Sequence, residues 1–123
     1  MESNLDDITE GFTYFFDFDL QKYVDLNNDL PPISELNKAL REKNKFYSDK
    51  GDEASRTQLN TFYSLIKKIF YERDDDLNLT KSSFLGRKLF IRYLKKESSF
   101  AQMAPMAVVF GLILADFIQK YVK

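Results

Sequence analysis

The chain has 123 residues, no cysteine, no histidine and a formal net charge of −1 at pH 7. This length suits one domain that buries a core without covalent staples. The composition excludes disulfides and thiolate metal sites, and it removes the usual proton shuttle at neutral pH and the commonest transition-metal ligand.

Charge is unevenly distributed along the chain. Residues 1–30 carry eight acids and one base, Lys22, for a charge of −7, whereas residues 31–123 carry seventeen bases and eleven acids, for +6. This division predicts two oppositely charged faces that prefer different partners or neutralise each other in an assembly. Residues 1–7 are acidic and polar, unlike a secretory signal, so we expect a cytoplasmic location.

The first predicted element lies in this acidic, aromatic N-terminal segment. Apolar residues follow Ser3 at helical spacing, which indicates that Ser3 is a helix N-cap. Between Phe12 and Leu20, however, apolar and polar residues also alternate as in a strand. No second strand is evident to pair with it, and we therefore favour a helix that breaks near Asp17–Asp19.

Two amphipathic helices are predicted in the middle of the chain. The first begins near Pro32 or Ser34 and is followed by a loop at Ser48–Asp52. The second runs from about Glu53 to Arg73. Its apolar positions form one inner face, made of Leu59, Phe62, Tyr63, Ile66, Ile69 and Phe70.

The last two predicted helices differ in polarity. One runs from Phe84 to about Lys96, with its N-cap among residues 80–83. The other contains Met103–Ala115, which is apolar on every side and therefore predicts a central buried helix. Its uncharged run is shorter than the roughly 20 residues that a bilayer needs, so a membrane anchor is the lesser alternative. Together the pattern predicts one all-α domain over residues 1–123, a compact bundle of about five helices around the C-terminal helix.

The helix from Phe84 carries the sharpest functional signal. Between Lys81 and Lys96 there are six bases and no acid. At helical spacing five of the bases share one arc of about 100°, opposite the apolar residues, and these five are Lys81, Lys88, Arg92, Lys95 and Lys96. Such a stripe attracts phosphate backbones through counterion release. The alternatives are a solvated face partly neutralised by the acidic N-terminal segment and contact with anionic lipid. Bases on the preceding helices extend the predicted nucleic-acid contact, namely Arg41, Lys45 and Lys67, with Lys38, Lys43 and Lys68 as further candidates.

The aromatic part of the N-terminal segment has two interpretations. Its rings belong either to the core or to a surface that docks on another protein. The predicted docking residues are Phe12, Tyr14, Phe16, Asp17, Phe18 and Asp19. Stacking on nucleic-acid bases is disfavoured because the neighbouring carboxylates repel phosphates.

No catalytic or cofactor motif is evident. Asp74–Asp76 with Asn78 invites comparison with a calcium loop, but the EF-hand ligand spacing, its central glycine and its closing glutamate are missing. We therefore expect a solvated loop there, no metal, no cofactor and no enzymatic activity.

Four stretches, Ser34–Tyr47, Ile66–Glu72, Phe84–Ser98 and Phe110–Tyr121, carry a resemblance to a known family. In order and spacing they resemble the small all-helical subunit of type III CRISPR effector complexes, the III-A form in particular. The resemblance implies a non-enzymatic, RNA-binding subunit of an antiviral defence complex that stacks with other subunits, including copies of itself. It also implies contacts to the guide–target backbone from Lys88, Arg92, Lys95 and Lys96, with Arg41, Lys45 and Lys67 beside them.

A second hypothesis remains open. In this hypothesis the chain is a small helical inhibitor, of the immunity or anti-defence type, that docks on a basic protein through its acidic aromatic N-terminal segment.

Overall fold

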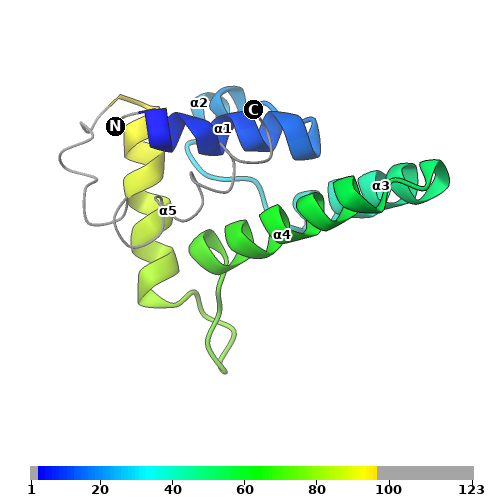
Figure 1. Ribbon diagram of the computed structural model, residues 1–123. Helices are drawn as coiled ribbons and strands as arrows, with labels where there is room; N and C mark the ends of the chain where they lie inside the picture. The colour runs from blue at the N-terminus through cyan, green and yellow to red at the C-terminus, as the bar shows by residue number, and fades with distance from the viewer. Residues whose placement is uncertain (1–2, 97–123) are drawn as a thin grey trace.

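The computed structural model describes residues 3–96, which form five helices (Figure 1). In chain order they are α1 (Ser3–Phe16), α2 (Leu20–Asn27), α3 (Ile33–Lys50), α4 (Glu53–Phe70) and α5 (Lys81–Leu94). The predicted all-α bundle is confirmed. The predicted central helix, which contains Met103–Ala115, lies outside the described residues. The described part of the chain nevertheless has five helices, because the expected first helix is divided into α1 and α2.

The arrangement combines a long arm with a crossing layer. In Figure 1, α3 and α4 run side by side as an antiparallel hairpin, and α1 lies across the base of this arm with α2 beside it. α5 stands at the opposite end from the tip of the arm and contacts α4 and α2.

The break predicted between α1 and α2 is present, and no strand forms over residues 12–20. Asp17 adopts a left-handed conformation with φ 54°, and the Phe18 N–H donates to the carbonyl of Phe12 at 3.2 Å. Asp19 then caps α2, because its carboxylate accepts a hydrogen bond of 3.1 Å from the Lys22 N–H.

The turn between α3 and α4 is tighter than predicted. We expected a loop over Ser48–Asp52, but Ser48 to Lys50 form the last turn of α3. Gly51 ends the helix at φ 70°, where a side chain would be strained, and Asp52 caps α4 by accepting from the Ser55 N–H at 3.1 Å. The connection between the two helices therefore consists of only Gly51 and Asp52, because the left-handed conformation of Gly51 reverses the chain direction.

α4 and α5 each differ from prediction by about a turn. α4 ends at Phe70 rather than near Arg73. α5 begins at Lys81, three residues before Phe84, because Thr80 is its N-cap and accepts from the Ser83 N–H at 3.2 Å.

Between these two helices the chain makes a short hairpin-like loop that projects from the body in Figure 1. Arg73 and Leu79 pair in an antiparallel bridge. The Asp74 carboxylate accepts from the N–H groups of Asp76 and Asn78 at 2.9 and 3.0 Å, so it is used to hold the turn. In the described part of the chain, no group of three or more acidic side chains is placed to hold a metal ion.

The core is built from phenylalanine rings on α1 and α4. Phe15 stacks on Phe62 at 4.7 Å between centroids, and Phe12 and Phe16 meet the same ring at 6.0 and 5.5 Å. Phe12 is 0% exposed and Phe16 is 4% exposed. The rings of Phe12 and Phe16 therefore belong to the core, which was one of the two interpretations of this segment. They are not available to dock on a partner.

A second ring pair joins α5 to this core. Phe70 at the end of α4 stacks on Phe90 of α5 with centroids 5.2 Å apart, and both side chains are fully buried. Leu94, one turn further on, is buried on the same side. This pairing fixes which face of α5 is turned inward.

Candidate nucleic-acid interface

The outer face of α5 carries exposed bases, as the sequence predicted. Lys81, Lys88 and Arg92 are exposed, whereas Phe90 and Leu94 on the opposite side are buried. Among the described side chains, residues 8–96, no carboxylate lies within 4.0 Å of the charged groups of these three bases. The face therefore presents positive charge that the described protein does not neutralise by direct pairing.

The two lysines that end the stripe differ from each other. Lys95 is only half-exposed and its ammonium donates to the side-chain carbonyl of Asn28, so part of its donor capacity is used within the protein. Lys96 is exposed and follows the helix in a left-handed conformation, φ 62°. The continuous part of the stripe consequently runs from Lys81 to Arg92.

Arg87, the base that helical spacing places off the stripe, points inward. Its guanidinium lies 2.9 Å from the Asp29 carboxylate, 3.4 Å from the Phe70 carbonyl and 5.0 Å from the centre of the Tyr71 ring. Tyr71 is buried, and its hydroxyl donates to the carbonyl of Pro31 at 2.5 Å. These contacts join α5 to the end of α4 and to the loop between α2 and α3.

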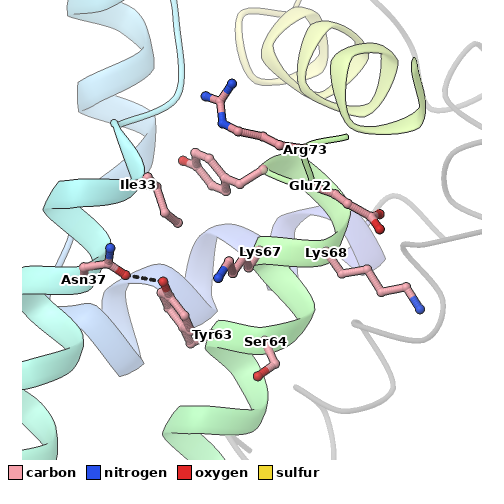
Figure 2. A pocket seen from close by; sticks show the side chains of 9 residues that line it. Ile33, Asn37, Tyr63, Ser64, Lys67, Lys68, Glu72 and Arg73 are labelled. Carbon is pink, nitrogen blue, oxygen red and sulfur yellow. Dashed lines mark hydrogen bonds between the residues drawn. The ribbon is translucent and has the colours of Figure 1, made fainter. Parts of the chain in front are cut away.

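Two hollows open on either side of this contact group. The α5 hollow has a volume of about 380 Å³ and is lined by Asn28, Asp29, Phe84, Arg87, Lys88, Ile91 and Arg92. The α3/α4 cavity has a volume of about 550 Å³ and is lined by Ile33, Asn37, Tyr63, Ser64, Lys67, Lys68, Tyr71, Glu72 and Arg73 (Figure 2). Each is lined by three bases and one acid, so both attract anions.

The hollows are neighbours because Arg87 lines one, Tyr71 lines the other, and the two side chains are in contact. The Arg87–Asp29 pair lines the α5 hollow. The bases of α5 and those at the end of α4 are therefore brought together from segments about twenty residues apart.

Inside the α3/α4 cavity, a hydrogen bond sets the orientation of the polar groups. The Tyr63 hydroxyl donates to the Asn37 side-chain carbonyl, which joins α4 to α3 (Figure 2). A tyrosine hydroxyl is protonated at neutral pH, and burial raises the pKa of Tyr63 further above its usual range, so the group remains a donor. Lys67 projects toward the α3 side of the cavity, whereas Lys68 and Glu72 project to the other side.

Two of the predicted nucleic-acid contacts are not brought to this region. Arg41 and Lys45 are exposed on the middle and outer turns of α3, along the arm that extends away from α5 (Figure 1). Lys45 also lies 3.9 Å from Asp49 on its own helix. Of the six candidate bases on the earlier helices, Lys67 and Lys68 line the α3/α4 cavity.

Two bases beside the hollows, Arg73 and Arg87, were not predicted as contacts from the sequence. Arg73 follows the end of α4, so its sequence position gave a weak signal. Arg87 gave one as well, because it is the only base between Lys81 and Lys96 that falls off the stripe. Its inward contacts depend on Asp29 and Tyr71, which no local pattern connects to it.

The remaining residues predicted for protein docking have roles within the fold. Asp17 pairs with Lys43 at 2.8 Å and Asp19 caps α2. Phe18 is half-buried against Tyr23, with ring centroids 5.5 Å apart, whereas Tyr14 remains 48% exposed. This leaves a small aromatic surface at most.

Comparison with known proteins gives no match to a family model, to a curated protein or to a solved structure. None of the helices within the described range has both the length and the apolarity to cross a bilayer. A function for this chain therefore has to be argued from the geometry of its charged surfaces.

Proposed function

We propose that this chain is a non-enzymatic, RNA-binding subunit of a multi-subunit nucleoprotein complex, and that it contacts the phosphate backbone through the outer face of α5. The observation that carries the proposal is the α5 hollow: Lys88 and Arg92 line it together, both are exposed, and neither pairs with a carboxylate of residues 8–96. Contacts of this kind hold a strand without reading its sequence.

The surroundings of these two bases support a strand rather than a single small anion. The hollow is open on an exposed helix, and Lys81 lies two turns before Lys88 on α5. Phe84, which is 59% exposed, lies between them and lines the same hollow. An exposed ring beside cations suits an unpaired strand, because a base can stack on it while the backbone follows the charges.

The resemblance to the small subunit of type III CRISPR effectors gives this proposal its biological setting, an antiviral defence complex in the cytoplasm. The resembling stretches include α5 and the end of α4, which are the segments that the fold brings together around the two hollows. Contacts with other subunits, including further copies of the chain, belong to the same proposal.

The inhibitor hypothesis has less support from the structure. Its docking segment contributes Phe12 and Phe16 to the core, and Asp17 is paired with Lys43. Only Tyr14 of the predicted aromatic residues keeps about half of its surface in solvent.

A charge-reversal experiment tests the proposal. The double variant Lys88→Glu with Arg92→Glu is compared with Arg41→Glu with Lys45→Glu, which makes the same change of charge on the α3 arm. Affinity for an unstructured RNA of about 30 nucleotides is measured by fluorescence anisotropy, and helix content by circular dichroism. We expect the α5 variant to bind about tenfold or more weakly and the arm variant to change little. Equal losses, or no binding by the unaltered chain, would refute the proposal.

A further inference from the structure

The α3/α4 cavity differs from the α5 hollow in size and in the chemistry of its walls. At about 550 Å³ it is within the range of sites that enclose a small molecule, which is about 300–1,000 Å³. Its walls combine two tyrosine rings and one isoleucine with hydroxyl, amide and cationic groups. This mixture suits a ligand that has both an apolar ring and an anionic group.

The charge of the cavity selects an anion. Lys67, Lys68 and Arg73 face a single acid, Glu72. No carboxylate in residues 8–96, the side chains that the structure describes, lies within 4.0 Å of the charged nitrogens of these three bases. Arg73 uses one N–H to donate to the Leu77 carbonyl at 2.8 Å, which holds its guanidinium beside the cavity and leaves its other N–H groups for a ligand.

The cations are arranged around the apolar wall. Figure 2 shows Lys67 and Arg73 at opposite ends of the region beside Ile33, with Lys68 and Glu72 projecting to the other side. Tyr71 is 5% exposed and its hydroxyl is held by the Pro31 carbonyl, so the part of its ring that reaches the cavity is small and fixed. A planar ring that packs against Ile33 and this part of Tyr71 would place an attached anion within reach of Lys67, with Arg73 at the other end of the site.

Other lining residues supply donors that distinguish a polar ring from a hydrocarbon. The Asn37 side-chain carbonyl accepts from the Tyr63 hydroxyl, and this leaves the amide N–H groups of Asn37 as donors. The Ser64 hydroxyl also lines the cavity and is exposed. Carbonyl groups and ring nitrogens of a nucleobase, or the hydroxyls of a ribose, are suitable acceptors.

From these observations we infer that the α3/α4 cavity binds one nucleotide that carries a phosphate monoester. The phosphate lies against Lys67, the base packs on Ile33 and the exposed part of Tyr71, and Arg73 lies at the other end of the site. This goes beyond the proposed strand binding, because it requires neither Lys88 nor Arg92. The ligand is either a free nucleotide or the terminal nucleotide of a phosphorylated strand, since both present the same groups.

The first test is a titration of the isotope-labelled full chain with adenosine and uridine monophosphates, followed by NMR. We expect saturable shifts at the amides of Asn37, Ser64 and Lys67. Lys67→Gln should weaken binding about tenfold or more, because it removes one charge-assisted contact without disturbing a bond within the protein. Arg73→Gln should act similarly, and Lys45→Gln, on the arm, should leave the affinity unchanged.

Controls separate this site from a general anion trap. Adenosine and inorganic phosphate, tested alone, should each bind at least about tenfold more weakly than adenosine monophosphate, because each contacts only part of the cavity. Equal affinity for inorganic phosphate, equal affinity for adenosine, or no saturable shift would each overturn the inference for a free nucleotide.

A second arm uses RNA with and without a 5′-phosphate. If the ligand is a strand end, the phosphate should strengthen binding in the unaltered chain and in the Lys88→Gln variant, but not in Lys67→Gln. If neither the monophosphates nor the strand end depends on Lys67, the inference is wrong. If RNA binding still depends on Lys88 and Arg92 in that case, the proposed function is supported even though the nucleotide site is not.

Discussion

Arg87 and Asp29 are 58 residues apart in the chain, and their side chains meet at 2.9 Å where α5 lies against the loop between α2 and α3. The Arg87 side chain is 15% exposed and that of Asp29 is 59% exposed. Because successive residues of a helix are about 100° apart, turning Arg87 inward leaves Lys88 and Arg92 on the outer face. The pair therefore helps to set the orientation of the proposed binding surface.

Replacing this arginine should destabilise the fold. Arg87→Met removes the pair with Asp29, a bond to the Phe70 carbonyl and the contact with the Tyr71 ring. We expect a loss of about 1–2 kcal/mol in the free energy of unfolding, since one partner is well exposed and the pair is partly screened. Urea denaturation followed by circular dichroism measures it. Lys88→Met, one residue away and exposed, should change stability by less than about 0.5 kcal/mol, and equal losses in both variants would contradict the role given to Arg87.

Tyr71 should make stability depend on alkaline pH. Burial raises the pKa of Tyr71, with the nearby Arg87 acting in the opposite direction. The folded chain keeps the phenolic proton at a pH where the unfolded chain loses it. The stabilisation is therefore complete below about pH 10 and is lost as the pH rises above it, by about 1.4 kcal/mol per unit.

The variant Tyr71→Phe isolates this effect. At neutral pH it should be less stable by about 1–3 kcal/mol, because the buried Pro31 carbonyl loses its donor. Denaturation between pH 8 and 11 should show a steeper decline for the unaltered chain than for Tyr71→Phe. Parallel curves would mean that the Tyr71 hydroxyl is as accessible as in an unfolded chain.

Much of the fold could be predicted from local pattern. The inner face of α4 follows helical spacing, and Leu59, Phe62 and Ile66 are buried as expected. The break at Asp17–Asp19 also follows from local chemistry, because an aspartate there caps the next helix. The end of α3 was predicted less well, since the loop composition of Ser48–Lys50 is overridden by the reversal at Gly51.

The candidate site was predictable only along a single helix. Spacing alone separated Lys88 and Arg92 from Arg87, and the structure agrees with this separation. Helical spacing could not show that Lys67 lines a cavity while Arg41 and Lys45 lie on the arm, because these positions depend on how α3 and α4 pack against the other helices. Contacts between distant segments, such as that between Arg87 and Tyr71, have no local signature.

The N-cap of α5 should contribute to presenting the basic face. Thr80→Ala removes the side-chain acceptor for the Ser83 N–H and should cost about 1 kcal/mol. Thr80→Ser keeps the hydroxyl and should retain most of the stability. Thermal denaturation of the two variants makes the comparison. If alanine and serine behave alike, the cap bond does not contribute.

The ring cluster between α1 and α4 should be essential for stability. Phe62 is 0% exposed and meets three rings of α1, so Phe62→Ala should cost about 3–5 kcal/mol or prevent folding. Phe46→Ala is the matched control, because Phe46 is 50% exposed and its ring contacts the ammonium of Lys50 at 4.7 Å. It should cost less than about 1 kcal/mol. If Phe62→Ala and Phe46→Ala had similar midpoints in chemical denaturation, Phe62 would not be part of the cooperative core.

The most direct test of the central claim is the salt dependence of RNA binding. The logarithm of the affinity is plotted against the logarithm of the salt concentration for the unaltered chain, for Lys88→Gln with Arg92→Gln, and for Arg41→Gln with Lys45→Gln. Each phosphate contact on a single strand contributes about 0.7 to the slope, so losing the two α5 contacts should reduce its magnitude by about 1.4, with no reduction for the arm variant. An unchanged slope in the α5 variant would contradict backbone binding by this face.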